Sequence, residues 1–271
     1  MVLAPTDPLI LRTEAIALRV SPFSRTSHVV TWLSPEHGRV TTVVKGACRP
    51  KSAFLGQYDL FATCELLFYR RDHDGVHAIR ECSPLEPRNE LRDDWRRITT
   101  ASYFCDLLAR VAQPAQESAD LCRLLGAALD DLRQRPPAAE TILRFELDML
   151  RHLGLLPHLE LCPICHTPAH PWLRFALASG RARCAHTAPS AAGEPTITLH
   201  RDVVEQMQRL TQPAPSAPAA PDVAHLSLGS RRFLGIFLRF HLDTPPAPRR
   251  LAFELLESDP ASFGAVKGES R

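Results

Sequence analysis

The sequence has no long apolar segment and very little lysine. No run of about 18 apolar residues occurs, so no transmembrane helix is expected. The first ten residues, MVLAPTDPLI, lack the basic start and the sustained apolar run of a signal peptide, so we expect a cytoplasmic protein without a membrane partner. Lysine occurs only at Lys45, Lys51 and Lys267 among 32 basic residues. The preference for arginine, together with the many alanines and prolines, indicates the base composition of the genome more than selection for bidentate contacts.

The short motifs of common catalytic sites are also missing. The sequence contains no GxxxxGK[ST] phosphate loop, no strand followed by GxGxxG, no GxSxG nucleophile elbow and no HExxH metal motif. The 12 histidines are spread along the chain. We therefore expect no enzymatic activity, no catalytic residues and no organic cofactor.

The 8 cysteines are too few for a disulfide scaffold in a chain of 271 residues. Five of them lie singly among apolar neighbours, which predicts buried free thiols in a reducing compartment. These five are Cys48, Cys64, Cys82, Cys105 and Cys122.

The charge is nearly balanced overall, with 32 Lys and Arg against 30 Asp and Glu, but it is unevenly distributed. Residues 1–80 carry ten basic and seven acidic side chains, residues 81–160 carry ten and fourteen, and residues 161–271 carry twelve and nine. The two ends are therefore basic and the middle is acidic.

The N-terminal region has the pattern of β-strands. Five runs rich in β-branched and aromatic residues occur between Thr13 and Glu81, and no helical periodicity interrupts them. Turn chemistry separates runs at Ser21-Pro22, at Pro35 to Gly38 and at Asp72 to Gly75. Five strands in about 70 residues predict a small antiparallel barrel, and the pattern fits both an OB-fold and an SH3-like barrel.

Beyond Pro87 the apolar residues recur at a spacing of three to four, which is typical of amphipathic helices. Helices are predicted over residues 91–108, 118–132, 138–153, 201–210 and 226–243. Acidic residues at Glu90, Asp93 and Asp94 favour a helix start there, and Gly154 favours a helix end. The Arg- and Glu-rich residues 88–97 are interpreted as the charged face of the first helix.

The most specific local motif is Cys-Pro-Ile-Cys at residues 162–165, because two cysteines at this spacing can bind one metal ion. A third cysteine follows after 18 residues, but the position that would complete a second pair is Thr187. The histidines that could supply the fourth ligand are His186, His166 and His170. The ligand set we expect for one structural zinc is Cys162, Cys165, Cys184 and His186. The alternative is a metal-free loop with three free thiols; a redox CxxC is disfavoured because no βαβ pattern surrounds it.

Basic residues are frequent on the predicted barrel. They are Arg19, Arg25, Arg39, Lys45, Arg49, Lys51, Arg70 and Arg71. A groove that follows a phosphate backbone needs several cations on one face, and Phe23, Phe54 and Tyr58 are aromatic residues suited to stacking on bases. The alternative is an ordinary solvated surface, and composition does not decide between the two.

Several of these segments together resemble one protein family. Residues 14–61, with Phe-Ser-Arg-Thr-Ser, Glu-His-Gly-Arg and Lys-Gly-Ala-Cys-Arg-Pro-Lys-Ser in order, closely resemble the N-terminal domain of the bacterial DNA repair protein RecO. Residues 145–165 resemble the helix that enters the zinc region of that family. FLGIFLRFHL and the following PRRLAFELL resemble its C-terminal helices. The resemblance covers most of the chain except a Pro-rich stretch, expected to be a stiff exposed loop at 211–221, and an expected frayed tail at 259–271.

The resemblance implies an α+β multidomain fold. Its expected parts are an OB-fold nucleic-acid-binding domain at 1–85, a helical domain at 86–158 and 199–258, and a zinc-ribbon-like insertion at 159–198. It also implies a recombination mediator that anneals complementary strands and helps load the RecA recombinase onto single-stranded DNA during repair. Its implied partners are single- and double-stranded DNA, RecR and single-stranded DNA-binding protein.

The resemblance also assigns roles to particular residues. The family's Lys-Gly-Ala-x-Arg-x-Lys segment maps onto Lys45, Arg49 and Lys51. Together with Arg19, Arg25 and Arg39, which are basic residues of the predicted barrel, these are the DNA-binding residues that we expect. The tail of single-stranded DNA-binding protein is expected at Arg144 and Arg151, beside a stripe of Phe145, Met149 and Leu153 that is itself interpreted as core. Two alternatives stay open at this stage: a metal-dependent or nucleotide-binding enzyme on the same scaffold, and a protein-only adaptor with an incidental basic face.

Overall fold

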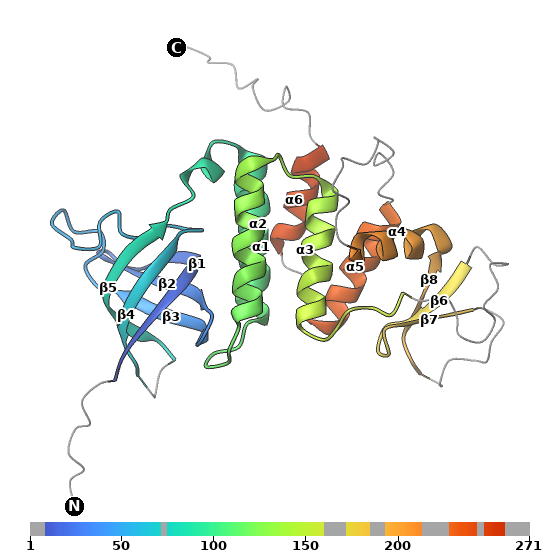
Figure 1. The fold of residues 1–271 in the computed structure, drawn as a ribbon, viewed down its shortest axis with the longest axis horizontal. Coiled ribbons are helices and arrows are strands. Elements are labelled where there is room, and N and C mark those ends of the chain that lie inside the picture. The colour runs from blue at the N-terminus through green and yellow to red at the C-terminus, as the bar shows by residue number, and fades with distance from the viewer. Residues whose placement is uncertain are drawn as a thin grey trace, which may run out of the picture. The chain divides into compact units, whose positions relative to one another are not determined.

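The computed structural model describes residues 9–71, 75–159, 172–184, 193–212, 228–242 and 247–257 (Figure 1). The chain divides into two compact units, unit 1 with Met1–Pro137 and Pro246–Arg271 and unit 2 with Ala138–Pro245. The helices expected to form one domain therefore fall in both units. Among the described helices, none combines the length and the apolar character needed to cross a bilayer.

Unit 1 begins with a closed barrel. Its strands are β1 (Ile10–Ser24), β2 (Ser27–Ser34), β3 (Gly38–Val44), β4 (Thr63–Tyr69) and β5 (His77–Glu86). They are arranged in the order β1-β2-β3-β5-β4, and β1 closes the barrel against β4. All pairs are antiparallel except β3 with β5, which run parallel where Thr42 meets His77. This arrangement is OB-like, which confirms the expected N-terminal fold.

The first strand is long enough to pair with two neighbours. Its first half pairs with β4 and its second half with β2. The turn expected at Ser21-Pro22 is wrong, because Pro22 lies inside β1 opposite His28 and the chain reverses after Ser24. The ladder is irregular between Pro22 and Ser24, and proline is tolerated at such an irregularity because it has no N–H to donate.

The barrel core consists of the inward-pointing residues of all five strands. Val30, Trp32, Val40, Leu66 and Phe68 are almost completely buried there. The indole Nε1 of Trp32 donates a 2.9 Å hydrogen bond to Oγ1 of Thr42, so the polar atom of this large side chain is satisfied inside the core. Each such side chain contributes about 1.5–3 kcal/mol through burial.

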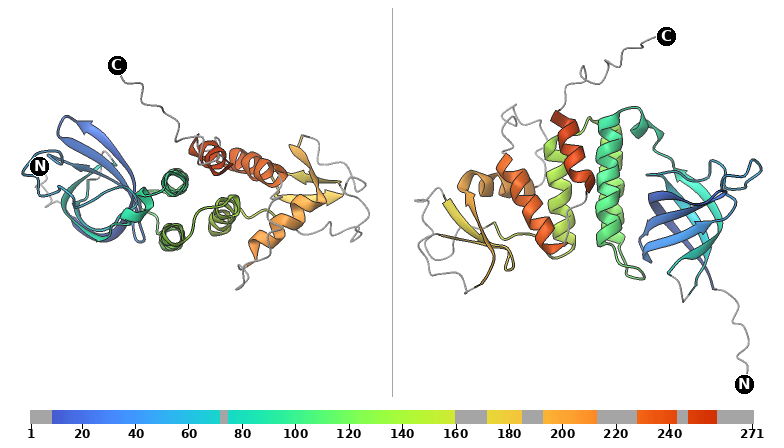
Figure 2. Two further views of the ribbon diagram at one scale, coloured as in Figure 1. Left: turned by 90° about the horizontal axis from the view of Figure 1, so that it is seen from above. Right: turned by 180° about the vertical axis from the view of Figure 1, so that it is seen from behind.

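Unit 1 also contains helices. They are the 3₁₀ helix η1 (Asn89–Arg92), α1 (Trp95–Val111), α2 (Ala119–Gln134) and α6 (Ala247–Glu257). Of these, α1 and α2 pack against the barrel. α1 contacts β1, β2, α2 and α6, and Figure 2 shows α1 and α2 end-on next to the barrel. α1 begins later than predicted because Asp94 is its N-cap, where the side chain accepts the N–H of Arg96 at 2.7 Å.

The β2–β3 hairpin predicted at Pro35 to Gly38 is confirmed, and it touches the α1–α2 connection. Arg39 N–H donates to the carbonyl of Gln113 at 3.1 Å, and Ala115 N–H donates to the carbonyl of His37 at 2.9 Å. Gly38 has φ 62°, and a Cβ at this position would lie 2.2 Å from the Gln113 oxygen. The close approach therefore requires glycine.

Unit 2 combines three helices with a small sheet. Its elements are α3 (Ala139–His152), β6 (Trp172–Ala176), β7 (Arg181–Cys184), β8 (Thr196–His200), α4 (Arg201–Thr211) and α5 (Leu228–His241). The antiparallel sheet has the order β7-β6-β8, and periodicity did not predict its strands. Phe175 of β6 packs against Phe233 and Phe237 of α5, with ring centroids 4.9 and 5.9 Å apart.

α3 ends where the sequence predicts. Gly154 has φ 70°, and Leu155 N–H donates to the carbonyl of Leu150 at 2.8 Å, which is a Schellman-type end. Phe145 and Met149 are 3% and 0% exposed, which confirms the interpretation of these two residues as core.

Candidate nucleic-acid interface

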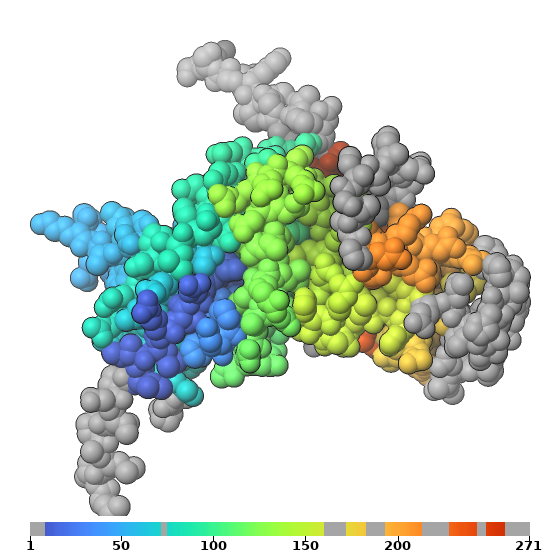
Figure 3. All heavy atoms as spheres, in the orientation of Figure 1, coloured from blue at the N-terminus to red at the C-terminus, as the bar shows by residue number. Residues whose placement is uncertain are grey.

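Two segments meet at one end of the barrel, which we call the barrel tip. They are the β1–β2 turn at residues 24–27 and residues 45–58 of the connection between β3 and β4. Cys48 N–H donates to the carbonyl of Thr26 at 3.2 Å, and Gly46 N–H donates to Oγ of Ser27 at 3.3 Å. The light-blue connection projects from the barrel surface in Figure 3. Hydrogen bonds therefore hold residues from two separate sequence motifs next to each other.

The connection after β3 is built from successive tight turns. Arg49 N–H donates to the carbonyl of Gly46 at 3.1 Å, and Ser52 N–H donates to that of Arg49 at 2.9 Å. Gly46 has φ 70°, and a Cβ there would lie 3.3 Å from Cδ of Arg49. The arginine side chain thus folds back over the glycine, whose positive φ favours this residue type.

Four predicted DNA-binding residues lie together at the barrel tip. Arg25, Lys45, Arg49 and Lys51 are all exposed. Within the part of the chain that the structure describes, no ion pair joins any of the four to a carboxylate. Their charges are therefore available to an external anion such as a phosphate.

The aromatic residues proposed for base stacking differ in exposure. Phe23, beside the β1–β2 turn, is 64% exposed. Phe54 and Tyr58 instead pack against the barrel core, where Tyr58 contacts Trp32 edge-on at 6.2 Å. Sequence analysis overlooked Leu55, which is 63% exposed at the same end of the barrel. Phe23 and Leu55 are the apolar side chains that the tip presents to solvent.

The prediction that Cys48 is a buried thiol is wrong, because it lies on the tip connection and is exposed. Its Sγ lies 3.2 Å from Nε2 of His28, whose Nδ1 lies 2.7 Å from the hydroxyl of Tyr58. Burial raises the pKa of Tyr58 to about 12. Cys64, Cys82 and Cys105 are buried as predicted, and Cys122 is partly buried.

Arg19 and Arg39 lie on the side of the barrel that faces α1. Arg19 forms an ion pair with Asp106, and Arg39 donates to the carbonyl of Ala109 at 3.3 Å. Burial, followed by the nearby charges of Arg110 and Arg39, lowers the pKa of Arg19. The structure therefore does not bring these two arginines together with the four at the tip.

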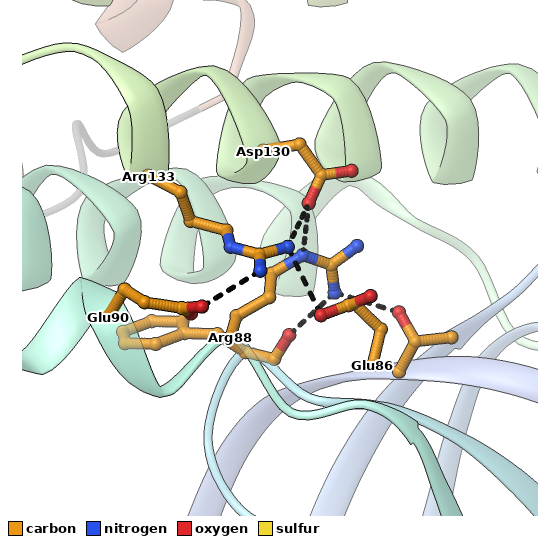
Figure 4. A network of polar contacts seen from close by, with 7 residues as sticks. Glu86, Arg88, Glu90, Asp130 and Arg133 are labelled. Atoms are coloured by element: carbon orange, nitrogen blue, oxygen red, sulfur yellow. Dashed lines mark hydrogen bonds and ion pairs between the residues drawn. The ribbon is translucent and has the colours of Figure 1, made fainter.

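Arg88, which the sequence did not single out, is one of the two arginines in the network in Figure 4. It lies before α1 at φ 49°, is 5% exposed, and is not on the charged face of a helix as expected. Its guanidinium donates to Asp130 at 2.7 Å, to the Phe61 carbonyl at 3.0 Å and to Thr63 Oγ1 at 2.8 Å. Nothing in the local sequence distinguishes Arg88 from its exposed neighbours, because all three partners are distant in the chain.

Most of the expected zinc ligands lie outside the described residues. This applies to Cys162, Cys165 and His186, and also to the alternatives His166 and His170. Cys184 is the last residue of β7, where its backbone pairs with Leu173 of β6. In the described ranges no cluster of three or more metal-binding side chains occurs.

The two expected partner-binding arginines lie on α3, near the C-terminal end of α4. Arg144 pairs with Glu140 and donates to the carbonyls of Leu210 and Gln212 at 3.1 and 2.9 Å. Arg151 pairs with Asp148 and donates to the carbonyl of Thr211 at 2.9 Å. Both cations thus satisfy carbonyl groups at the end of α4, where positive charge is favourable.

Two protein-family models match consecutive parts of this chain. The model described as "Recombination protein O N terminal" matches residues 9–88, which contain the barrel. The model described as "Recombination protein O C terminal" matches residues 92–250, which contain helices α1 to α5 and the small sheet.

Curated relatives agree with these matches. A DNA repair protein RecO from Anaeromyxobacter sp. (strain K) is 30% identical over 250 residues, which cover 90% of this chain and 96% of that protein. The protein of the same name from Rhodopirellula baltica is 26% identical over 260 residues, covering 95% and 89% of the two chains. The one from Alkaliphilus metalliredigens is 29% identical over 178 residues, covering 65% and 71%.

Proposed function

The chain belongs to the recombination protein O (RecO) family of DNA repair proteins, and from this membership we propose that its barrel tip binds single- and double-stranded DNA, anneals complementary strands and helps load RecA. The observation that carries the proposal is the set of four exposed tip cations without a described acidic partner. Each can replace a counterion on a phosphate without first giving up an ion pair within the protein.

Annealing needs no bond-making chemistry. Two strands repel each other through their phosphates, and cations at the tip reduce this repulsion while the base edges stay free to pair. The exposed ring of Phe23 offers a face on which a base can stack, irrespective of its identity. The proposed binding is therefore independent of sequence and weakens as the salt concentration rises.

The test compares two triple variants by fluorescence anisotropy with a labelled single-stranded oligonucleotide at several salt concentrations. Lys45→Ala, Arg49→Ala and Lys51→Ala together should weaken binding and reduce the salt slope by roughly 2, because each phosphate contact on single strands contributes about 0.7. The matched control combines Arg12→Ala, Arg123→Ala and Arg135→Ala, which removes the same charge from exposed arginines that are ion-paired with carboxylates.

The control should retain its affinity and its salt slope. Equal losses in both variants would mean that net charge alone matters, and an unchanged affinity in a folded tip variant would contradict the assignment. As a second readout, bound DNA should slow alkylation of the exposed thiol of Cys48, since this residue lies between Lys45 and Arg49.

We also propose that RecR and single-stranded DNA-binding protein are partners, the latter docking through its acidic tail near α3. Arg151 is the better residue for a test, because its side chain is 41% exposed compared with 23% for Arg144. Arg151→Glu should weaken binding of a tail peptide and leave oligonucleotide affinity unchanged. If Arg151→Glu weakens both peptide binding and oligonucleotide binding, or weakens neither, a separate partner site is contradicted.

One structural zinc at Cys162, Cys165, Cys184 and His186 is the remaining part of the proposal. Three thiolates and one imidazole form a set that tetrahedral zinc accepts, and a closed site of this kind stabilises a fold without taking part in chemistry. Through Cys184 it would connect residues 162–165 to the end of β7. Elemental analysis should give about one zinc per chain, and Cys162→Ser should lose it; a stable, metal-free protein would favour the loop with free thiols.

A further inference from the structure

A cavity of about 200 Å³ lies at the end of the barrel where β1 begins. Its wall includes Leu11 of β1, Val40 of β3 and Phe68 of β4, together with Pro114 and Ala115 of the α1–α2 connection. β1 runs from this end to the barrel tip, so the cavity is separate from the cations to which DNA binding is assigned.

Positive charge is concentrated around this cavity. The arginines in the lining are Arg39, Arg70 and Arg71. No acidic residue belongs to the lining that the structure describes, and Asp72 and Asp74 lie outside the described residues. Several cations around one concave site favour an anionic ligand, and guanidinium groups are suited to the oxygens of a phosphate.

Aromatic rings lie beside these cations. Phe68 stacks on His77 with centroids 5.2 Å apart and an interplanar angle of 30°, and His37 meets Phe68 edge-on at 6.0 Å. Nδ1 of His77 accepts the backbone N–H of Arg71 at 3.2 Å, which ties the imidazole to the arginine-bearing connection. A flat ring bound here therefore meets aromatic faces within the same cavity that presents guanidinium groups.

We propose that this cavity binds one mononucleotide, with its phosphate at Arg39 and Arg71 and its base against the rings of His37 and His77. The volume of about 200 Å³ is below the range of about 300–1,000 Å³ typical of clefts for drug-sized ligands, so the cavity has no room for more than one nucleotide. The end of a DNA strand and a free nucleotide share this chemistry. The inference does not depend on the proposed function of the tip.

The first experiment measures binding of deoxyadenosine 5′-monophosphate, deoxyadenosine and inorganic phosphate to the full chain by calorimetry. The monophosphate should bind more tightly than either fragment. Arg71→Gln should weaken its binding about tenfold, as expected for the loss of a hydrogen bond to a charged group. The control Arg80→Gln removes an exposed arginine of β5 that pairs with Glu81 and does not line the cavity, and it should bind like the unmodified protein.

The inference is overturned if the monophosphate shows no binding at millimolar concentration, or if Arg71→Gln and Arg80→Gln weaken it equally. It is also overturned if the triple tip variant loses monophosphate binding, because the two surfaces would then not be separate. Retained binding in the tip variant supports the cavity whatever the outcome of the DNA titration, so the two proposals fail independently.

The source of the nucleotide is resolved with 5′-phosphorylated and 5′-hydroxyl oligonucleotides of one sequence. A preference for the phosphorylated strand that Arg71→Gln abolishes assigns the cavity to a strand end. Binding of the free monophosphate without this preference assigns it to a free nucleotide, and both outcomes support a mononucleotide site.

Discussion

At the barrel tip, Arg25 and Arg49 are exposed and have no described acidic partner, whereas on the side of the barrel that carries the helices Arg19 pairs with Asp106 and Arg88 with Asp130. Both regions contain arginines, but only those on the helix-facing side have a carboxylate partner among the described residues. A cation that already has a carboxylate within the protein stabilises the fold, while one without such a partner can bind a phosphate at little cost. The location of an arginine, more than the abundance of arginine, is therefore the basis for the proposed DNA surface.

The largest effect is expected at the most buried arginine on the helix-facing side. Arg88→Ala should lower the free energy of unfolding by about 3 kcal/mol, because the Phe61 carbonyl, Thr63 Oγ1 and Asp130 lose their donor. Urea denaturation measures it. Arg123→Ala, which removes an exposed arginine of α2 paired within its own helix, is the control and should change stability by less than about 0.5 kcal/mol. If Arg88→Ala and Arg123→Ala lower the free energy of unfolding by similar amounts, the distinction between buried paired arginines and exposed ones is wrong.

A smaller effect should separate Arg19 from Arg49. Arg19→Ala is expected to lower the free energy of unfolding by about 0.5–1 kcal/mol, through loss of the pair with Asp106, and to leave oligonucleotide affinity unchanged. Arg49→Ala should weaken oligonucleotide binding and leave the free energy of unfolding unchanged. Paired denaturation and anisotropy measurements test this; an equal loss of affinity in both variants would place Arg19 on the DNA surface, as the sequence alone suggested.

Two glycines of the tip connection provide a matched comparison. Gly46 and Gly56 have φ 70° and 73°, so alanine at either position should cost about 1 kcal/mol of stability. Only at Gly46 does a new methyl group meet Arg49, whereas nothing lies within 4 Å at Gly56. Gly46→Ala should therefore weaken DNA binding and Gly56→Ala should not; equal affinities would mean that the position of Arg49 over Gly46 is unimportant.

The last effect is absent at neutral pH and appears only in alkali. The pKa of Tyr58 is about 12 in the folded protein, above its ordinary value of 10.0, chiefly because of burial. Its contribution to stability is therefore fully present below pH 10 and is lost as the pH rises from 10 towards 12. Tyr58→Phe should lose less stability than the unmodified protein over this interval, as measured by denaturation at stepwise pH. If the free energies of unfolding of Tyr58→Phe and of the unmodified protein fall in parallel between pH 10 and 12, Tyr58 is ionised as readily in the folded as in the unfolded protein.

Local sequence determined those features whose physical cause is also local. The β-branched runs predicted all five barrel strands, Pro35 to Gly38 predicted a hairpin, and Gly154 predicted the end of α3. These predictions succeeded because strand and helix periodicity, the φ of proline and the positive φ of glycine act over a few residues. The prediction at Ser21-Pro22 failed because a proline also fits an irregular strand, and its neighbours across the sheet decide between the two.

The roles of the arginines depended on tertiary structure. Arg19 meets Asp106 across 87 positions and Arg88 meets Asp130 across 42, so no short window of sequence contains both partners. The sequence by itself established a basic barrel followed by an acidic helical region. Only the folded chain decided that Arg25, Lys45, Arg49 and Lys51 share one exposed end while Arg19, Arg39 and Arg88 face the helices, because an ion pair forms wherever folding brings opposite charges together, however far apart they are in the chain.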